Sequence, residues 1–287
     1  MNEAMHYQNQ TKRRDILLTV FFIVMSLYGF YKNGFTYYMT GYLSFFEAVY
    51  PLLFPLIAVL VGVGWNILHK RSLFYQLNFF LFISLLMPPA MPIWLYLLVW
   101  VLFLGCSPFL KKIPLSKTFL FKICTILLFA VLLQGNYENS VESSVSYAYG
   151  SLDLFLGRAV GNVGTTSILL LLGCFAVFCT DFYYKKEIPI LTIVSYAVLV
   201  LFYSILTSSP MLILDLLNSH VWVVAIFFAP LNKYSPVLKK EQYGYAIILG
   251  ICCFLFSRFF HLTNGAYVAY LLVQLGQFVI YKFLKKV

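Results

Sequence analysis

The amino-acid sequence predicts an all-α membrane protein that crosses the bilayer several times. Of its 287 residues, 62% are hydrophobic and only 10% are charged, so the chain cannot bury its apolar surface in a soluble core. The apolar residues form long runs, and short breaks rich in Pro, Gly, Lys or Arg separate these runs. The net charge of +10 lies mainly in the breaks, as topology signals do, so the expected partner is the lipid bilayer and not nucleic acid.

Ten apolar runs approach the length of a transmembrane helix, which is about 20 residues and less where the helix is broken. They cover residues 16–31, 45–68, 73–87, 91–110, 119–133, 166–184, 188–206, 211–229, 243–260 and 266–283. Pro51 and Pro55 are expected to kink the second run. The motif SLLMPPAMP separates the third run from the fourth so tightly that we expect a re-entrant or broken arrangement there.

The distribution of basic residues predicts the orientation. Most Lys and Arg residues fall on one side of a ten-span topology, and only Lys32, Arg158 and Arg258 fall towards the other side. By the positive-inside rule, both termini are cytoplasmic. Residues 1–15 then form a cytoplasmic N-terminal segment, and the expected location is the inner membrane of a bacterial cell.

A polar loop divides the chain into two halves. Residues 134–150 carry Glu138 and Glu142 and no Lys or Arg, and we expect this loop to be external. Residues 16–133 and 151–287 then hold five segments each, and because five is odd, the halves enter the membrane from opposite sides. The breaks SLLMPPAMP and IFFAPLNKYSP close the third segment of each half. This pattern predicts an inverted repeat, an architecture that places sites near the midplane on discontinuous helices.

A glycine-rich polar block interrupts the apolar pattern within LDLFLGRAVGNVGTTSILLLL, residues 152–172. Its glycines allow the backbone to turn, and its hydroxyl side chains can cap the helix that follows. In lipid, irregular backbone is tolerated only where protein buries it or where it lines a polar cavity. The block is therefore the first candidate site, and the alternative is that it only starts a helix. The candidate binding residues are Gly157, Gly161, Gly164, Thr165, Thr166 and Ser167.

Ionisable residues within apolar runs are costly and are rarely without a function. Snorkelling or an interfacial ion pair would explain Glu47, Asp153, Arg158 and Arg258. Asp215 is a candidate ion or proton site, because it lies about one helical turn from the outer surface. Alternatively, its carboxylate binds the Ser and Asn side chains near it.

The remaining polar residues indicate no metal site and no enzyme of a soluble type. His220 is expected to be a hydrogen-bonded structural residue, because no second His or carboxylate lies at i+3 or i+4. The six cysteines show no C-x-x-C spacing, so packing between helices explains them. No nucleotide-binding loop and no nucleophile paired with a base can be argued from spacing, so no catalytic residue is assigned.

Two stretches begin a resemblance to a known family that covers the chain from about residue 73. SLLMPPAMPIW resembles an apolar run that ends in I-P-P-x-x-P-W. LFLGRAVGNVGTTSILLLLG resembles the block F-x-G-x-x-x-G-S-x-G-E-T-S. Matching positions in that block are Gly161, Gly164, Thr166 and Ser167, whereas Asn162 and Thr165 replace the Ser and the Glu.

Two further stretches complete the resemblance. FFAPLNKYSP resembles A-T-D-P-V-T-S-P and keeps Ser235 and Pro236 without the acidic residue. SRFFHLTNGAYVAYLLVQL resembles R-x-F-G-G-Y-P-D-G-V-A-F-A-x-L-L and keeps Arg258, Phe260, Gly265 and Ala269. The chain thus resembles the D subunit of the Rnf electron-transport complex and the B subunit of the sodium-translocating NADH:quinone oxidoreductase.

This resemblance implies a ten-helix fold similar to urea transporters and a flavin cofactor. The family carries riboflavin noncovalently and an FMN linked by a phosphodiester to a Thr in an S-G-A-T motif. Here residues 146–149 read S-Y-A-Y, and Tyr149 stands where the acceptor Thr would fall, so covalent FMN is not expected. The family's G-x-N-x-F-N-P-A segment has no counterpart in PFLKKIPLSKTFLFK. These departures indicate a divergent member of the family, which binds flavin (riboflavin or FMN) or a quinone noncovalently, or keeps the fold with another task. The expected cofactor is noncovalent flavin, and the expected cofactor-binding residues are those of the glycine-rich block and Arg258.

Three functional hypotheses follow. The first is a membrane subunit of a flavin-dependent electron-transport system, which works with other membrane subunits. The second is a transporter or channel for a small polar solute, because polar breaks at the interface of an inverted repeat would suit one. The third is a structural or assembly subunit without a cofactor.

Overall fold

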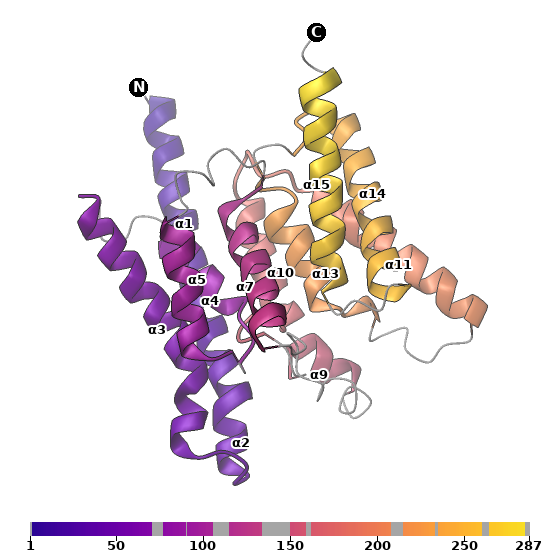
Figure 1. Cartoon of the computed structure of the whole chain (residues 1–287). Helices are drawn as coiled ribbons and strands as arrows, with labels where there is room; N and C mark the ends of the chain where they lie inside the picture. Colours follow the sequence, from indigo (N-terminus) through magenta and orange to yellow (C-terminus); the bar gives the residue numbers. More distant parts are fainter. Residues whose placement is uncertain are drawn as a thin grey trace. The chain divides into compact units, whose positions relative to one another are not determined.

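A computed structural model describes residues 2–70, 77–89, 91–105, 115–133, 150–158, 162–207, 215–232, 235–259 and 264–284. Within these ranges the regular secondary structure is entirely helical, as predicted (Figure 1). Each of the ten predicted apolar runs overlaps at least one of the helices, and the second run coincides with its helix at both ends. The elements are α1 (Asn2–Phe30), η1 (Tyr31–Phe35), α2 (Thr36–Met39), α3 (Phe45–Leu68), α4 (Leu77–Leu85), α5 (Ile93–Gly105), α7 (Lys117–Leu133), α9 (Ser151–Leu156), α10 (Ile168–Cys179), α11 (Glu187–Thr207), α13 (Ser219–Val223), η3 (Val224–Phe228), α14 (Lys239–Arg258) and α15 (Gly265–Leu284).

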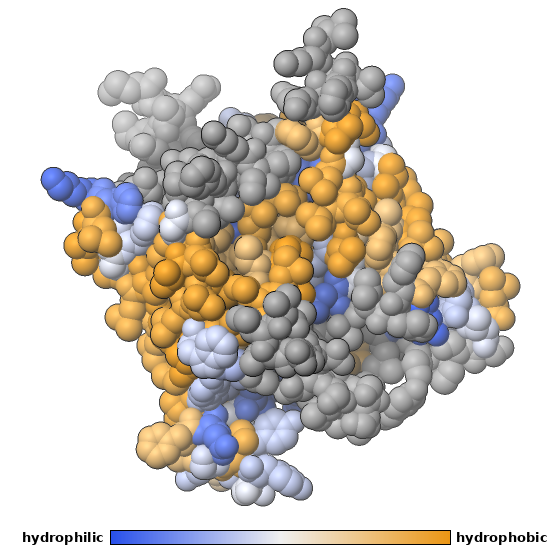
Figure 2. Space-filling model, viewed as in Figure 1, coloured by the Kyte–Doolittle hydropathy of each residue, from blue (hydrophilic) through white to orange (hydrophobic). Residues whose placement is uncertain are grey.

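The exposed faces of the helices are apolar. Three helical stretches among the described residues are long and apolar enough to cross a membrane, namely Arg13–Met39, Phe45–Leu68 and Glu187–Thr207. Large apolar side chains such as Leu60 and Phe202 are 70% and 62% exposed. Figure 2 shows hydrophobic residues in orange over much of the visible helical surface. A surface of this kind is stable in lipid and not in water, so the chain is a helical membrane protein.

Helix α3 shows how local sequence sets an element's limits. Ser44 is its N-cap, and the Glu47 carboxylate accepts hydrogen bonds from the Ser44 backbone N–H at 2.8 Å and from its hydroxyl at 2.7 Å. This capping box satisfies donors at the start of the helix. Pro51 and Pro55 lie inside the helix, as predicted. The Glu47 side chain therefore acts as a helix cap, and the predicted interfacial ion pair is not needed to explain it.

The chain forms two compact units, which are described separately. Unit 1 comprises Met1–Leu104 and Phe121–Phe182, and unit 2 comprises Gly105–Leu120 and Tyr183–Val287. In unit 1, α1 packs against α3, α4 and α10. The ring of Phe22 on α1 stacks on Phe82 of α4 at 5.5 Å, and Trp100 of α5 lies 4.6 Å from the ring of Phe121 on α7. Buried aromatic contacts of this kind make up much of the core of unit 1.

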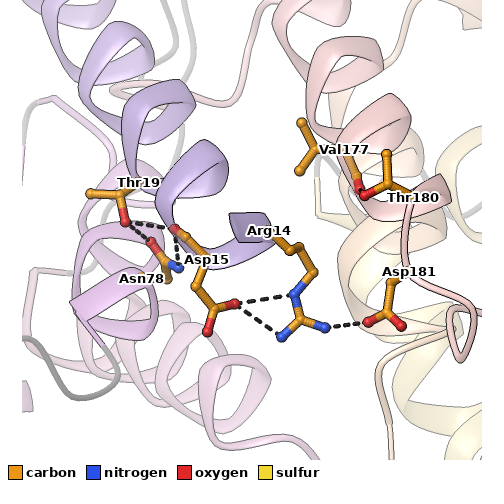
Figure 3. A network of polar contacts seen from close by, with 7 residues as sticks. All are labelled: Arg14, Asp15, Thr19, Asn78, Val177, Thr180 and Asp181. Atoms are coloured by element: carbon orange, nitrogen blue, oxygen red, sulfur yellow. Dashed lines mark hydrogen bonds and ion pairs between the residues drawn. The ribbon is translucent and has the colours of Figure 1, made fainter. Parts of the chain in front are cut away.

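A polar network fixes the start of the membrane-spanning part of α1 (Figure 3). The Arg14 guanidinium pairs with Asp15 at 2.9 Å and with Asp181, which follows α10. The Thr19 hydroxyl donates to the Asn78 side chain of α4 at 2.7 Å, and Asn78 donates to the Asp15 carbonyl at 2.9 Å. Three separate helical regions of unit 1 are thereby joined by polar contacts.

In unit 2, α14 packs along both α11 and α15. At Gly250 of α14 a Cβ would lie 2.7 Å from the Thr192 carbonyl oxygen, so glycine permits close helix packing there. The break after η3 is bound by side chains from several elements. The Lys185 ammonium donates to the carbonyl and hydroxyl oxygens of Ser235 at 2.7 and 2.6 Å. Burial lowers the pKa of Lys185 below its ordinary value.

Tyr270 is the side chain of α15 that reaches the end of η3. Its hydroxyl donates to the Phe228 carbonyl at 3.1 Å and accepts a hydrogen bond from the Asn232 amide at 2.7 Å. Tyr270→Phe should destabilise the protein by about 1–3 kcal/mol, because the Phe228 carbonyl and the Asn232 amide are buried and each loses its hydrogen bond with the Tyr270 hydroxyl. Denaturant titration in detergent would measure this loss. Tyr243→Phe, at an exposed position of α14, is the control, and an equal effect of both variants would contradict the role given to Tyr270.

Candidate functional site

The glycine-rich block begins where α9 ends. Gly157 terminates α9 with a left-handed backbone (φ +82°), and the Arg158 N–H donates to the Asp153 carbonyl at 2.7 Å. The Asp153 carboxylate also pairs with the Arg158 side chain at 3.1 Å, and an ion pair was one of the expectations for each residue. At the other end of the block, the Ser167 hydroxyl accepts from the Leu170 N–H at 3.4 Å and caps α10. Local chemistry thus explains both limits of the block.

The block pairs with the end of α4 inside unit 1. The Val163 N–H donates to the Met87 carbonyl at 2.8 Å, and the Gly164 N–H donates to the Leu85 carbonyl at 3.1 Å. A helix that ends inside an apolar environment leaves carbonyls without a partner, so these bonds stabilise the α4 terminus. The two predicted breaks therefore meet at these residues, and the N–H groups of Val163 and Gly164 satisfy carbonyls at the end of α4.

Lys122 completes this junction. Its side chain is 0% exposed, and its ammonium donates to the Leu86 carbonyl at 2.7 Å and to the Asn162 side-chain oxygen at 3.4 Å. Asn162 in turn donates to the Thr165 hydroxyl at 3.2 Å. A cation beside the C-terminal carbonyls of a helix is favoured by the helix dipole. Lys122 therefore links α7, the end of α4 and the block.

A second lysine reaches the block from α1 and η1. The Lys32 side chain is 6% exposed, and its ammonium donates to the Thr166 hydroxyl at 2.7 Å. Thr166 also donates to the Gly157 carbonyl at 3.2 Å. Gly29, one turn earlier, lies so close to the Val163 carbonyl that a Cβ there would overlap it. The chain from residue 28 to residue 33 thus runs directly beside the block.

Two residues close to Lys32 in the sequence each hold a buried polar atom. Within the described ranges, the Tyr28 hydroxyl and the Asn33 side-chain nitrogen have no hydrogen-bond partner. Tyr28 precedes Lys32 by four residues, so both lie on one face of the helix, and Asn33 is the next residue in the π-helical turn η1. Buried polar atoms are costly without a partner, and π-helical turns occur frequently at functional sites. These atoms indicate a ligand or water near residues 28–33.

The glycines of the block pack against protein atoms. A Cβ at Gly157 would overlap the backbone of Ser167, and a Cβ at Gly164 would overlap the side chain of Leu85. Thr165, Thr166 and Ser167 are all buried, with exposures of 0%, 7% and 1%. Gly161 lies outside the described residues, as does Tyr149. The predicted site residues of unit 1 that the structure describes lie together. Lys32 and Lys122 contact the same stretch of chain through Thr166 and Asn162.

Arg258 belongs to unit 2, where it forms a separate cluster with Asp215. The two side chains approach to 3.7 Å, and the Arg258 guanidinium lies 4.9 Å from the ring centre of Tyr203. The Tyr196 hydroxyl donates to the Asp215 carbonyl at 2.9 Å. Asp215, predicted as an ion or proton site, is therefore paired with a cation of the protein. Arg258, for which an ion pair was one expectation, forms one with Asp215.

Arg258→Met should destabilise unit 2 by about 1–2 kcal/mol, since the pair is about one third exposed and a cation–π contact is lost with it. The measurement is a double-mutant cycle with Asp215→Asn, in which thermal unfolding gives the stability of the wild type, both single variants and the double variant. A coupling energy near zero would show that the two side chains do not stabilise each other.

Other candidate residues have structural surroundings. The His220 ring nitrogen lies 3.2 Å from the Tyr267 hydroxyl, as predicted for a hydrogen-bonded His. Cys174 and Cys253 are buried free thiols. In the part of the chain that the structure describes, no cluster of three or more His, Cys, Asp or Glu side chains could hold a metal ion.

Comparison with known protein families shows to which family the chain belongs. Residues 115–287, more than half of the chain, match the model of the NQR2, RnfD, RnfE family. The chain belongs to the NQR2, RnfD, RnfE family. No curated protein sequence matches it significantly. Membership in the NQR2, RnfD, RnfE family supports a membrane subunit of a multi-subunit complex of Rnf or NQR type.

The part that matches the NQR2, RnfD, RnfE family contains Lys122, the glycine-rich block, Asp215 and Arg258. Tyr28, Lys32 and Asn33 precede it, so the α1 side of the site is contributed by residues outside the match. Sequence reasoning assigned Lys32 and Lys122 to topology and did not include them in the site. One signal could have found them, because each is a single Lys beside or inside an apolar run.

Proposed function

We propose that the chain is the membrane subunit of a flavin-dependent electron-transport system of Rnf or NQR type, that it binds flavin noncovalently, and that it works with other membrane subunits. Family membership supports the type of complex. The observation that carries the flavin proposal is the cluster of buried donors around the glycine-rich block, with the polar atoms of Tyr28 and Asn33 beside it.

The residues of this cluster fit a flavin in their chemistry. Flavin, when bound, supplies one- and two-electron transfer. The ammonium groups of Lys32 and Lys122, the Asn33 amide and the hydroxyls of the block are donors, and the polar edge of a flavin presents acceptors. Buried donors on helical elements orient a ligand and exclude water from it. Thr166 and Lys32 would hold the ligand against the start of α10.

The visible absorption spectrum of the detergent-purified full-length chain tests this function. We expect flavin absorption bands that bleach on chemical reduction. Thr166→Val should lower flavin occupancy several-fold, because it removes the hydroxyl that Lys32 contacts. Thr207→Val, at the exposed end of α11, should retain the wild-type occupancy. A colourless wild-type protein would contradict the proposal.

A small-solute pathway is the second candidate. It is favoured by buried amide atoms in unit 2 that lack a hydrogen-bond partner among the described residues, namely Gln242 Oε1 and Gln274 Nε2. Gln274 is 0% exposed, and its other amide atom accepts from the Tyr245 hydroxyl at 3.0 Å. Solute uptake into vesicles that contain the chain without flavin would support this alternative.

We also propose that the chain forms ten spans in two inverted five-helix repeats, with both termini in the bacterial cytoplasm. A recurring contact supports the repeat. In unit 1, Lys122 of the fifth predicted segment donates to the Leu86 carbonyl after α4, and in unit 2, Tyr270 of the tenth segment donates to the Phe228 carbonyl of η3. In each half, a side chain of the last segment thus binds the end of the third.

A reporter inserted after Tyr137 tests the topology. The proposed arrangement places this position on the periplasmic side of the membrane, so alkaline phosphatase, a reporter that is active only in the periplasm, should be active there. Activity of a cytoplasmic reporter at the same position would exclude the ten-span arrangement.

A further inference from the structure

The hairpin of α1 and α3 ends in a tip that the rest of unit 1 leaves uncovered. Helix α1 continues through η1 and α2, and a short turn then leads into α3 (Figure 1). In the tip, which we define as residues 35–47, every residue is exposed except Leu43, which is half-buried. Six of the exposed side chains are aromatic, namely Phe35, Tyr37, Tyr38, Tyr42, Phe45 and Phe46. A contiguous apolar surface of this kind marks a contact with another molecule or with a membrane.

The tip has a defined local structure of its own. The N–H groups of Tyr42 and Leu43 donate to the Tyr37 carbonyl at 3.0 and 3.3 Å. The ring of Tyr38 meets the ring of Phe45 edge to face, with 6.2 Å between the ring centres. The sequence of the tip thus sets its shape, and the exposed aromatic side chains belong to an ordered surface.

Helix lengths show how deep the tip lies in the membrane. About 20 helical residues cross the hydrocarbon core, which is about 30 Å thick. Counted from the exposed ion pair of Arg14 with Asp15, the core ends at about residue 35 of the chain. Counted back from His69, which follows α3, it ends at about residue 49. Gly34 and Ala48 are in close contact, so the two counts reach the same level.

The tip therefore lies beyond the hydrocarbon core, and its height matches the interfacial layer. This layer of headgroups adds about 5–8 Å on each side of the core. Each limb of the tip has about six residues, so the tip rises at most about 9 Å above the contact of Gly34 with Ala48. Aromatic side chains, Tyr above all, are enriched at the headgroup level, because their rings are apolar and the Tyr hydroxyl is polar.

The direction of exposure distinguishes lipid from a docked protein. The residues of α2, Thr36–Met39, are all exposed, and four consecutive residues cover a full helical turn. A docked protein covers one face of a helix, whereas lipid surrounds it. The surface is also continuous with apolar side chains lower on the hairpin, such as Leu56 of α3, which is 57% exposed. Residues 35–47 contain no Lys or Arg, so an anionic headgroup is not required.

We propose that residues 35–47 lie in the headgroup layer of the leaflet at the end of α1 opposite Arg14, where phospholipids surround the aromatic side chains. The apolar rings contact the upper part of the acyl chains, and the Tyr hydroxyls reach the polar oxygens of the headgroups. This contact holds η1, and with it Lys32, at a fixed depth. The inference does not depend on flavin binding.

Photocrosslinking of the full-length chain in its native cells tests the inference. The photoreactive residue p-benzoylphenylalanine replaces Tyr42 or Phe46, and the membranes are irradiated before the chain is purified. Mass spectrometry should then show the added mass of one phospholipid at both positions. The same replacement at Leu56, on the same hairpin but within the hydrocarbon core, is the matched control and should give a similar yield. Each replacement is at an exposed position, so the fold is retained.

Fluorine NMR gives an independent measurement of depth. Trifluoromethylphenylalanine is placed at Phe46 or Leu56, and the chain is reconstituted in phosphatidylcholine nanodiscs. A water-soluble paramagnetic chelate should broaden the signal at Phe46 more than the signal at Leu56. Oxygen, which concentrates in the hydrocarbon core, should have the opposite effect.

Three results would overturn the inference. Lipid adducts at Leu56 but not at Tyr42 and Phe46 would place the tip in water. Crosslinks from the tip to a second protein would show that it is a docking surface for a partner. Equal broadening at Phe46 and Leu56 would contradict the depth derived from the helix lengths.

Discussion

Gly157→Ala should destabilise unit 1 by about 3 kcal/mol, the sum of backbone strain and steric overlap. Gly157 has φ +82°, a conformation that costs an L-residue about 1–2 kcal/mol. A Cβ at this position would also overlap the Ser167 backbone and lie 2.8 Å from the Ser167 side chain. Because Ser167 starts α10, the overlap would displace the block from Lys32 and Lys122. Unfolding in detergent measures the loss of stability.

Gly41→Ala separates the two causes. Gly41 has a similar backbone (φ +77°), but no atom lies within 4 Å of the position that a Cβ would take, so only the conformational cost applies. We expect a loss of about 1 kcal/mol for this variant. If Gly157→Ala and Gly41→Ala cost the same, the close contact between Gly157 and Ser167 does not constrain the block.

Lys122→Met should destabilise unit 1 by about 2 kcal/mol. The substitution removes the donor to the Leu86 carbonyl and the Asn162 side chain, and each buried group left without a partner costs about 1–3 kcal/mol. The variant no longer has to bury an ammonium group, and this gain in free energy offsets part of the loss. Denaturant unfolding is the measurement, and amide hydrogen exchange should show faster opening at the end of α4.

Lys240→Met on α14 is the control for Lys122→Met. Lys240 is exposed in the first turn of α14, so its loss should change stability by less than about 0.5 kcal/mol. Unchanged exchange at residues 85–87 in Lys122→Met would mean that Lys122 does not stabilise the α4 terminus.

Local patterns in the sequence were sufficient to predict where most of the helices lie, but not α2 or α9, which no predicted run covers. Residues 45–68 form one helix because Ser44 and Glu47 supply a capping box and the run behind them is continuously apolar. Ser167 caps α10 for the same kind of reason. The number of spans and the repeat stay predictions, because they describe orientation in a bilayer and not the local structure of a helix.

The contacts that build the site could not be predicted from local patterns. Lys122 was counted among the basic residues that set the orientation, but its side chain contacts residues about 40 positions away in both directions along the chain. Lys32 meets Thr166, which is 134 positions away. Such pairings depend on how helices pack, and a single sequence contains no local signal for them. The block itself was predictable, because glycine and hydroxyl residues inside an apolar run require a special explanation.

The structure explains two glycines of the block by packing and not by cofactor binding. Gly157 and Gly164 were predicted as cofactor-binding residues, and the structure gives both a close protein neighbour, Ser167 and Leu85. Contact with protein is enough to require glycine at these positions. Any direct part in cofactor binding stays a prediction, and the side chains that can donate to a ligand are those of the lysines and the hydroxyl residues.

Acid precipitation of the purified, full-length protein tests the central claim most directly. After precipitation, flavin is measured separately in the supernatant and in the washed pellet. The account predicts flavin in the supernatant, in an amount close to one molecule per chain, because the ligand is held by noncovalent contacts. Flavin that remains in the pellet would contradict noncovalent binding, and flavin in neither fraction would contradict a flavin-binding function.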